Sequence, residues 1–205
     1  MSCQLYLLTP PKIDAGFENT LAEVLGTGAV SALQIRLKDH SEAEIRKLAP
    51  PLIRLAQKQG VSVIINDDPI LAAELGADGV HIGQDDGSLK DARGTVGPNR
   101  IVGVTCHDSR HLAMQAGERG ADYVAFGAFF DTATKSPSSS ANVDLLEWWS
   151  EIFEIPCVAI GGITTENARP LVEAGADLLA VSGGIWNYPD GPAAAALAFE
   201  ALMKD

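Results

Sequence analysis

Short apolar runs recur along the whole chain, and segments with a helical pattern separate them. Several of these runs are apolar at every position, which is typical of parallel strands buried on both faces. Strands that alternate with helices indicate an α/β protein built on a parallel sheet. The eight expected strands are Leu5–Leu8, Ala32–Leu37, Val61–Ile65, Gly79–Ile82, Ile101–Thr105, Tyr123–Phe126, Cys157–Ile160 and Leu178–Ser182.

The segments between the strands carry helix signals. Ser41 followed by Glu44 is a capping box that opens an amphipathic helix. Pro50 and Pro51 are expected to kink that helix or to split it in two, because proline removes a hydrogen bond and clashes with the preceding turn. The other expected helix starts are Asp108 or Ser109 for the helix through Glu118, Thr164 or Thr165 for the helix through Glu173, and Pro192 for an Ala-rich final helix.

A Gly-Ala-Asp tripeptide precedes three of the expected strands, at residues 76–78, 120–122 and 175–177. Glycine just after a helix ends it in the left-handed region, and the following residues turn into the strand. The three aspartates could form a site, but they lie where strands begin. Barrel active sites gather where strands end, so we interpret these aspartates as structural.

The alternation and spacing of the elements predict a single (β/α)8 TIM barrel. The chain has 205 residues, near the small end for this fold, and 46% of them are hydrophobic, which suits a packed core. No linker or break in composition divides the sequence. One domain is therefore expected over residues 1–205.

Charge and cysteine content limit the partners. The formal net charge is −12, and an acidic surface repels nucleic acid and anionic lipid, so neither is an expected partner. No apolar run is long enough to cross a bilayer, and the first residues lack the pattern of a secretory signal. Cys3, Cys106 and Cys157 are odd in number and far apart, which disfavours a disulfide framework and favours the cytoplasm.

Polar residues occupy alternate positions at the end of the second expected strand, namely Gln34, Arg36 and Lys38. Alternation puts the three side chains on one side of the strand. An amide and two cations directed into a barrel are costly unless a bound anion or an internal acidic partner compensates them. The sequence leaves both interpretations open at this point.

Carboxylates follow the third and fourth expected strands, in Asn66-Asp67-Asp68 and Gln84-Asp85-Asp86. Carboxylates from neighbouring strand ends, together with water and phosphate oxygens, form the usual shell of Mg²⁺. A lone Asp-Asp pair more often caps the following helix. Two such pairs on successive strands, beside two cations, favour a metal site.

The fifth expected strand leads into Thr105-Cys106-His107. Thr105 offers a hydroxyl, beside backbone amides at a helix start, to an anion. Cys106 and His107 could indicate a thiol nucleophile, but adjacent residues of a strand point in opposite directions. We therefore expect a structural role for the Cys-His pair.

Three later loops carry phosphate-binding features. Thr132-Ala133-Thr134-Lys135 supplies hydroxyl donors and a cation, and this loop could also close as a lid. Gly161-Gly162 and Gly183-Gly184 follow the seventh and eighth expected strands, where barrels frequently bind phosphate. Glycine also serves tight turns, but two pairs at these two strand ends favour a phosphate site.

These motifs, in this order, resemble the thiamine phosphate synthase family over nearly the whole chain. The stretches that carry the resemblance are Leu33–Lys38, Asn66–Asp68, Gly79–Asp86, Thr132–Lys135 and Ala159–Ile163. The resemblance implies a transferase that joins 4-amino-5-hydroxymethyl-2-methylpyrimidine diphosphate to hydroxyethylthiazole phosphate, giving thiamine phosphate and pyrophosphate. It further implies a dissociative reaction, in which the C–O bond breaks before the thiazole nitrogen attacks and no protein base is needed.

The resemblance also implies residue roles. Gln34 would hold the aminopyrimidine, and Asp67 and Asp86 would hold the Mg²⁺ cofactor. The implied diphosphate ligands are Arg36, Lys38, Asn66, Thr105 and Lys135, of which Arg36, Lys38 and Lys135 act as catalytic cations. The implied ligands of the thiazole substrate and its phosphate are Thr132, Thr134, Gly162, Val181 and Ser182.

The chain departs from the family pattern in several places. After the sixth strand the family usually has Gly-Pro-x-x-Pro-Thr, whereas residues 127–132 here are Gly-Ala-Phe-Phe-Asp-Thr. Asp131 adds negative charge near the expected phosphate site, and the loss of two prolines loosens the loop, which puts affinity or lid closure in question. Asp68 stands where many members have Arg, and Thr105 stands where Ser is frequent.

Two other functions stay open. Related thiazole tautomerases share the barrel but tend to lack the diphosphate and metal residues present here. A non-catalytic phosphate-binding barrel is the alternative that Asp131 keeps open. The sequence fixes neither the oligomeric state, a homo-oligomer included, nor whether the thiazole substrate is carboxylated. Of Trp148 and Trp149, one is expected in the core and one at the surface or an interface, whereas Trp186 could be either.

Overall fold

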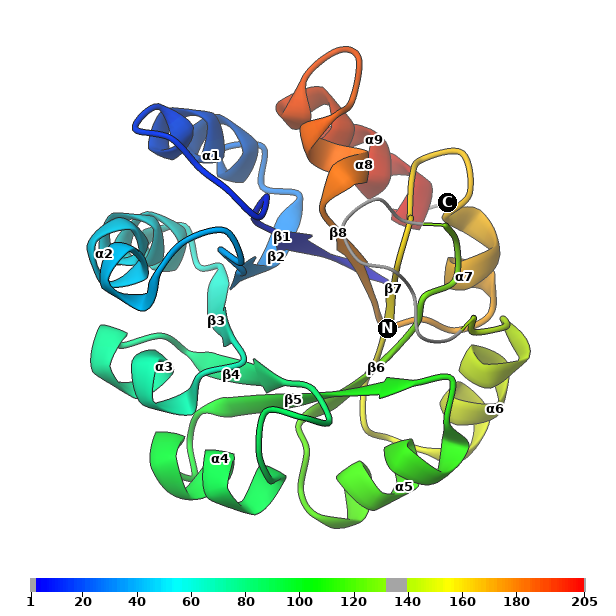
Figure 1. The fold of residues 1–205 in the computed structure, drawn as a ribbon. Helices are drawn as coiled ribbons and strands as arrows, with labels where there is room; N and C mark the ends of the chain where they lie inside the picture. The colour runs from blue at the N-terminus through cyan, green and yellow to red at the C-terminus, as the bar shows by residue number, and fades with distance from the viewer. Residues whose placement is uncertain (1–2, 132–139, 205) are drawn as a thin grey trace.

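The computed structural model describes residues 3–131 and 140–204 and shows a closed barrel of parallel strands in the order β1 to β8 (Figure 1). The strands are β1 Gln4–Leu8, β2 Val30–Ile35, β3 Ser62–Asn66, β4 Gly79–Ile82, β5 Ile101–His107, β6 Tyr123–Phe126, β7 Cys157–Ile160 and β8 Leu178–Val181. The predicted (β/α)8 barrel is confirmed. The bounds of β4, β6 and β7 match the expected runs, whereas β2 ends before Arg36.

Helices surround the barrel on its outside (Figure 1). They are α1 Phe17–Leu25, α2 Glu42–Lys58, α3 Pro69–Leu75, α4 Leu89–Val96, α5 Arg110–Glu118, α6 Asp144–Ile152, α7 Arg169–Glu173, α8 Gly183–Trp186 and α9 Pro192–Lys204. The predicted capping box at Ser41 and Glu44 is present, and α2 continues as one helix through Pro50 and Pro51 rather than splitting.

Two of the helix starts test the capping predictions. Ser109 caps α5 by accepting a hydrogen bond from the backbone of Leu112. The predicted cap at Thr164 or Thr165 is wrong, because α7 begins only at Arg169 and has no side-chain cap. Asn167 explains the difference. Its amide bonds the backbone of Thr164 and of Gly162, which holds this segment in a turn.

The core has two layers. The larger layer lies between the barrel wall and the helices and includes Leu5, Leu7 and Trp149, all fully buried. A smaller cluster fills the barrel interior and includes Tyr6 and Tyr123. The two sets alternate along β1, as a strand buried on both faces requires.

Trp149 and Trp148 divide as expected between core and surface. Trp149 is completely buried, and its indole nitrogen donates to the carbonyl of Ile155 at 2.7 Å. Trp148 is half-buried, and the guanidinium of Arg110 lies 4.6 Å from the centre of its ring. Trp186 is half-buried as well, and its indole nitrogen donates to the carbonyl of Leu8.

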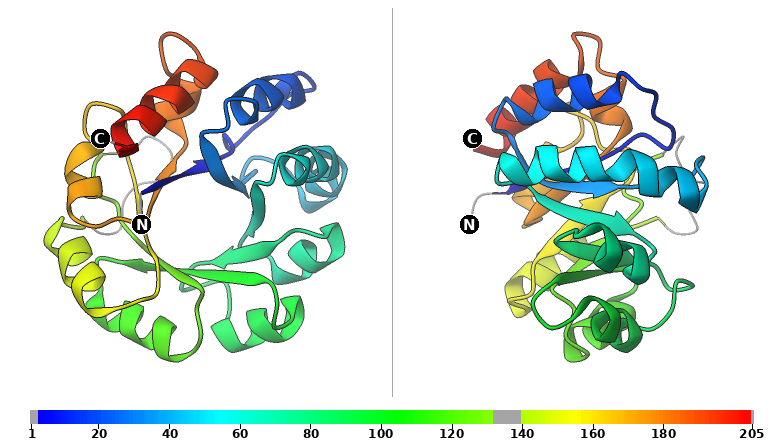
Figure 2. Two further views of the ribbon diagram at one scale, coloured as in Figure 1. Left: turned by 180° about the vertical axis from the view of Figure 1, so that it is seen from behind. Right: turned by 90° about the vertical axis from the view of Figure 1, so that its left-hand side faces the viewer.

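The aspartates of the three Gly-Ala-Asp repeats brace the start of neighbouring strands. Each carboxylate accepts a hydrogen bond from a backbone nitrogen of the preceding strand: Asp78 from Val63 at 2.7 Å, Asp122 from Val102 at 2.7 Å and Asp177 from Cys157 at 2.8 Å. Their structural role is confirmed. In the side view of Figure 2, both chain ends lie at this end of the barrel, away from the far ends of the strands.

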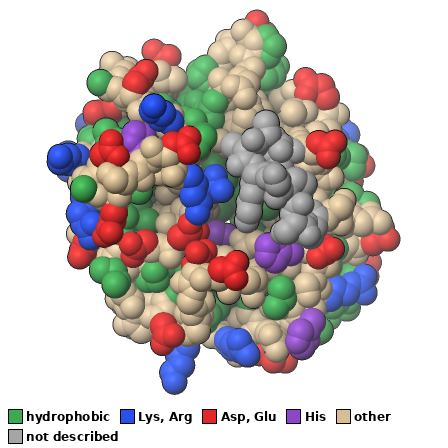
Figure 3. All heavy atoms as spheres, in the orientation of Figure 1, with side chains coloured by type: hydrophobic (Ala, Val, Ile, Leu, Met, Phe, Trp, Pro, Cys, Tyr) green, Lys and Arg blue, Asp and Glu red, His purple; other side chains and the backbone are tan. Residues whose placement is uncertain are grey.

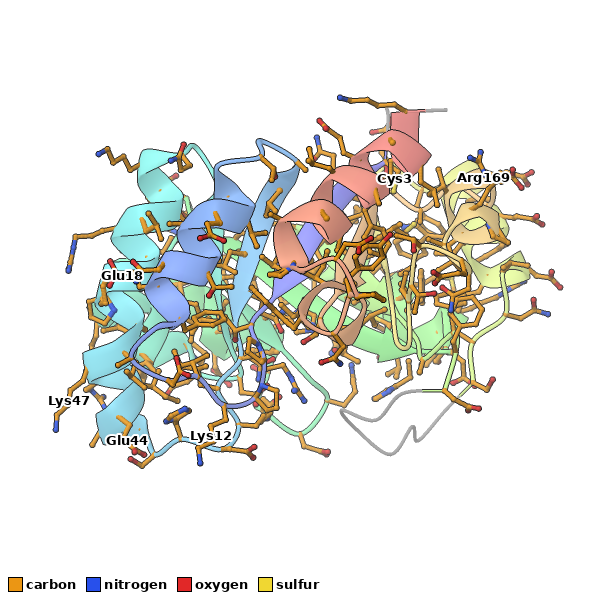
Figure 4. All side chains as sticks on the ribbon, turned by 90° about the horizontal axis from the view of Figure 1, so that it is seen from above. Cys3, Lys12, Glu18, Glu44, Lys47 and Arg169 are labelled. Carbon is orange, nitrogen blue, oxygen red and sulfur yellow. The ribbon has the colours of Figure 1, made fainter. Side chains whose placement is uncertain are left out.

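The three cysteines are all described, and all three are free. Cys106 and Cys157 are buried, and Cys3 is half-buried. Figure 4 places Cys3 at the opposite end of the barrel from Lys12, which follows β1. Within the described residues, no helix has the length and apolar character needed to cross a membrane.

Candidate active site

Charged side chains gather at the end of the barrel where the strands finish. Figure 3 views this face and shows Lys or Arg beside Asp or Glu around its centre, with histidine next to them. Parallel strands bring their carboxyl ends to the same face, so residues distant in sequence meet there. The residues predicted from the strand ends can therefore be located one by one.

Gln34 lies on β2 and points into the barrel, where it is 3% exposed. Its amide nitrogen donates to the hydroxyl of Tyr6 at 2.8 Å. Arg36 follows the strand end and is half-buried. Its backbone nitrogen donates to the hydroxyl of the buried Thr9 at 2.8 Å. The two side chains thus lie at successive levels, the amide inside the barrel and the guanidinium near its mouth.

Lys38 lies at the rim and forms an ion pair with Asp67. The side chains of Lys38 and Asp67 are 47% and 30% exposed, so water and ligands reach the pair. Of the two interpretations left open by the sequence, a bound anion or an acidic partner, Lys38 thus has the acidic partner, which is Asp67. Arg36 has no ion pair with any other described residue, which leaves its charge available near the barrel mouth.

Asp67 has an unusual backbone. Its φ of 68° lies in the left-handed region, which a residue with a side chain rarely adopts. Its backbone nitrogen donates to the carbonyl of His81 at 2.7 Å, which ties the end of β3 to β4. Such conformations persist where the surroundings enforce them and cluster at functional sites.

Asp67 and Asp86 line the same hollow, which has a volume of about 460 Å³ and is also lined by Asp68 and Asp85. Asp68 caps α3 by accepting from the backbone of Leu71 at 2.9 Å, so the capping interpretation holds for this residue. Asp86 is exposed, and its carboxylate accepts from the backbone of Gly83 at 2.8 Å. Its carboxylate oxygens therefore remain accessible from the hollow.

The donor set in this hollow suits Mg²⁺, which binds oxygen ligands and usually takes only one or two carboxylates beside water and substrate phosphates. No group of three or more His, Cys, Asp or Glu side chains in the described part of the chain could hold a metal ion. A protein cage, as for a structural metal, is thus not formed by these residues. Asp67 and Asp86 fit the sparser carboxylate set.

Asn66 is the last residue of β3 and is half-buried, opposite His81 in the strand register. Thr105 is half-buried on β5, and its hydroxyl lies 2.7 Å from the ring nitrogen Nε2 of His81. Two of the predicted diphosphate ligands, Asn66 and Thr105, therefore lie beside His81. The sequence motifs included His81 but gave it no role.

The surroundings of His81 are the feature that sequence reasoning missed. Its ring nitrogen Nδ1 lies 2.8 Å from the hydroxyl of Tyr123, which lies 2.9 Å from the hydroxyl of Tyr6. Burial lowers the pKa of His81 to about 4, and nearby charges modify this effect, Asp86 raising the pKa and Arg36 lowering it. The ring is therefore neutral near pH 7. Burial also raises the pKa of both tyrosines, which keeps their protons in place.

The Cys106–His107 pair has no nucleophilic geometry. Cys106 is completely buried on the outer side of β5, and burial raises the pKa of its thiol to about 12. His107 is half-buried and has a φ of 54°, at an irregularity in the pairing of β5 with β6. The expectation that Cys106 is structural agrees with this environment.

The glycines after β7 allow neighbouring loops to approach. A methyl group on Gly161 would overlap Ala128, and one on Gly162 would overlap the carbonyl of Asp131. Both glycines have positive φ, 107° and 63°. Packing therefore requires them whether or not they also bind phosphate. The loop that begins at Gly127 runs along the end of β7, with the nitrogen of Phe129 donating to the carbonyl of Ile160.

The β8 end supplies the remaining predicted residues. Val181 is buried at the last position of β8. Ser182 follows it, is half-buried and donates to the carbonyl of Thr9 at 3.3 Å. Asp131 is exposed, and its backbone carbonyl lies against Gly162 after β7. The other residues predicted for this side, Thr132, Thr134 and Lys135, lie outside the described residues.

A closed (β/α)8 barrel with cations and carboxylates at the carboxyl ends of its strands has the architecture of the TIM-barrel enzymes. The sequence model of the family described as thiamine monophosphate synthase matches residues 5–185. The chain belongs to that family.

Known relatives agree with this membership. A thiamine-phosphate synthase from Rhodospirillum centenum is 56% identical, over 98% of each chain. One from Erythrobacter litoralis is 53% identical, over 95% of this chain and 93% of the relative. Among solved structures, a thiamine phosphate pyrophosphorylase from Pyrococcus furiosus superposes with a TM-score of 0.86 at 28% identity, covering 98% of this chain and 95% of that one.

Proposed function

We propose that this chain catalyses the synthesis of thiamine phosphate from 4-amino-5-hydroxymethyl-2-methylpyrimidine diphosphate and hydroxyethylthiazole phosphate. The bond between the pyrimidinylmethyl carbon and the diphosphate oxygen breaks, and a bond between that carbon and the thiazole nitrogen forms. Pyrophosphate leaves with the electron pair. The observation that carries the proposal is the 56% identity to a named thiamine-phosphate synthase over 98% of both chains.

The pyrimidine diphosphate is proposed to bind across β2, β3 and β5. Gln34, buried inside the barrel, holds the aminopyrimidine. Arg36 and Lys38 at the mouth neutralise the diphosphate, assisted by the side chains of Asn66 and Thr105. Preorganised charges aimed at the leaving group stabilise the transition state because they need no rearrangement during the reaction.

The thiazole phosphate is proposed to bind on the opposite side, over the ends of β7 and β8. The proposed ligands of this substrate and its phosphate are the backbone at Gly162 and Val181 and the hydroxyl of Ser182. Thr132, Thr134 and Lys135, which lie outside the described residues, complete this proposal: the threonines toward the thiazole and Lys135 toward the diphosphate. Holding two reactants in one orientation replaces a bimolecular step by an effectively unimolecular one.

Mg²⁺ is the proposed cofactor, held by Asp67 and Asp86. The metal would supply positive charge to the oxygens of the departing pyrophosphate. Asp67 already contacts Lys38, so the proposed metal carboxylate and the proposed diphosphate cation share one rim. This juxtaposition suits a site that neutralises a highly charged leaving group.

No side chain needs to act as a base in this reaction, because the thiazole nitrogen attacks with a free electron pair. The environment of the site agrees with that requirement. His81 is neutral but fully engaged by Tyr123 and Thr105, and the thiol of Cys106 is buried. The barrel's contribution is therefore charge stabilisation and alignment.

The alternatives make different use of the same residues. A thiazole tautomerase needs neither a diphosphate site nor its metal, whereas here Lys38 pairs with Asp67, Asp67 and Asp86 line one hollow, and the charges of Arg36 and Asp86 both act on His81. A non-catalytic phosphate-binding barrel would bind the ligands without turnover. We place the proposed activity in the cytoplasm, in keeping with the three free cysteines.

Release of pyrophosphate from the purified protein tests the proposal. Release that requires both substrates and Mg²⁺, and that stops when EDTA is added, is the expected result. If calorimetry shows that a substrate binds but no pyrophosphate appears, the synthase proposal is wrong and the tautomerase or binding function takes its place. Asp131→Pro would then test whether the altered loop is responsible.

A further inference from the structure

An unbroken chain of hydrogen bonds crosses the barrel interior between two proposed substrate ligands. We define it as the interior relay: Gln34, Tyr6, Tyr123, His81 and Thr105. Gln34 at one end is the proposed pyrimidine ligand, and Thr105 at the other is a proposed diphosphate ligand. The three residues between them come from β1, β6 and β4.

The direction of the relay is fixed at its Gln34 end. The amide nitrogen of Gln34 can only donate, and it donates to the hydroxyl oxygen of Tyr6. The hydroxyl of Tyr6 is buried, and its other described contact is the hydroxyl of Tyr123 at 2.9 Å, so the proton of Tyr6 finds an acceptor when Tyr6 donates to Tyr123. By the same reasoning Tyr123 donates to Nδ1 of His81 at 2.8 Å.

Because Nδ1 of His81 accepts from Tyr123, it carries no proton, and the proton of the ring therefore lies on Nε2. Nε2 then donates to the hydroxyl oxygen of Thr105 at 2.7 Å. The proton of Thr105 is not used by His81. Since Thr105 is half-buried two residues before the end of β5, this proton can serve an acceptor at the barrel mouth.

We propose that His81 is a positioning residue, which acts through Thr105 by keeping the threonine hydroxyl as a donor to the diphosphate. The identity of the acceptor rests on the proposed function, whereas the order of protons along the relay does not. If the relay ran in the opposite direction, Thr105 would donate to His81 and would offer the anion only a lone pair.

Packing holds the relay in this arrangement. The ring of His81 stacks on that of Tyr123, with centroids 5.5 Å apart and an angle of 18° between the planes. The ring of Tyr6 meets Tyr123 edge-on, at 5.9 Å. Gly103 makes room for Tyr123, because a methyl group at this position would overlap the ring. Small shifts of these groups are therefore resisted by the filled barrel interior.

The first test is the tautomer of His81 in the ligand-free protein. Nuclear magnetic resonance of isotope-labelled protein distinguishes a protonated from a bare ring nitrogen, and the spectrum of His81→Asn identifies the His81 signals among the four histidines. A neutral ring with its proton on Nε2 is expected near pH 7. A proton on Nδ1, alone or together with Nε2, overturns the relay.

The second test is kinetic coupling between His81 and Thr105. Thr105→Val removes the hydroxyl and keeps the shape, and His81→Asn removes the donor that faces Thr105. Each is expected to lower kcat on the order of a hundredfold while leaving the KM for the thiazole phosphate unchanged. The double variant is expected to lose no more than either single variant, because both act on the same hydroxyl.

His81→Gln is the conservative control, since its amide nitrogen can take the place of Nε2, and it should recover most of the lost kcat. Losses that multiply in the double variant, or His81→Gln as impaired as His81→Asn, contradict positioning through Thr105 and leave His81 a packing residue. The two tests separate the hypotheses. A wild-type protein without turnover refutes the proposed function, whereas the position of the proton on the ring of His81 in the ligand-free protein still tests the direction of the relay.

Discussion

Two adjacent carboxylates at the rim, Asp85 and Asp86, are both exposed and line the same hollow as Asp67. Only Asp86 is a proposed metal ligand. The side chain of Asp86 accepts from the backbone of Gly83, which orients one oxygen and leaves the carboxylate facing the hollow. Neighbouring residues of the same type and exposure provide a matched pair for testing the metal site.

Asp86→Ala is expected to lower turnover on the order of a hundredfold or more, because it removes a ligand that holds charge beside the leaving group. Asp85→Ala, the matched control, is expected to stay near the wild-type rate. Pyrophosphate release at saturating substrates, measured against Mg²⁺ concentration, checks both. Equal losses in the two variants would mean that the general negative charge of the hollow matters, and not a ligand at Asp86.

Strand alternation predicts the direction of a side chain correctly within β2, but not past the residue where the strand ends. Gln34 lies inside the barrel as the alternation predicts. Lys38 lies beyond the strand, which ends at Ile35, and its exposed side chain pairs with Asp67 instead of entering the barrel. The relay was not predictable in the same way, since its middle member Tyr123 on β6 joins Tyr6 on β1 to His81 on β4, strands far apart in the sequence.

At the scale of elements, the aspartates before β4, β6 and β8 hold pairs of strands in register. Asp177 is the simplest case, because its carboxylate accepts from the backbone of Cys157 and forms no ion pair among the described residues. The bond joins β7 to the start of β8 at the end of the barrel away from the proposed site.

Asp177→Ala is expected to lower the free energy of unfolding by about 1 to 3 kcal/mol, because the backbone nitrogen of Cys157 loses its partner. Its kcat should stay unchanged. Asp190→Ala, in an exposed turn, is the control and should unfold like the wild type. Denaturant titration measures the stabilities. A loss of activity without a loss of stability in Asp177→Ala would instead indicate a functional role at this end.

The strands were easier to predict than the helix starts, for a physical reason. A strand buried on both faces leaves a continuous apolar run, as at β6 and β7. A helix start depends on which of several polar side chains captures the backbone. At Thr164 the backbone nitrogen donates to the side chain of Asn167, which stabilises a turn there. The helix α7 therefore begins only at Arg169.

For the whole molecule, burial of the neutral His81 makes stability depend on pH. The pKa of His81 falls from 6.5 to about 4 on folding, so between these values the unfolded chain binds a proton that the folded protein does not. The stability linked to His81 is therefore fully present above about pH 6.5 and is lost as the pH falls toward 4.

The size of this loss is about 3 kcal/mol at most, from the 1.36 kcal/mol that accompanies each pKa unit. The free energy of unfolding of the wild type and of His81→Asn should be compared by denaturant titration from pH 7 to pH 4. The difference between them is expected to shrink as the pH falls, because all other titrating groups are shared. A constant difference would contradict a buried neutral ring.

The barrel as a whole is proposed to bring a pyrimidine diphosphate and a thiazole phosphate together over the carboxyl ends of its strands. Mass spectrometry of the reaction mixture tests this claim most directly, with each substrate and Mg²⁺ omitted in turn. The mass of thiamine phosphate is expected only when all three are present. Both substrates recovered unchanged from the complete mixture, with correctly folded protein, would contradict it.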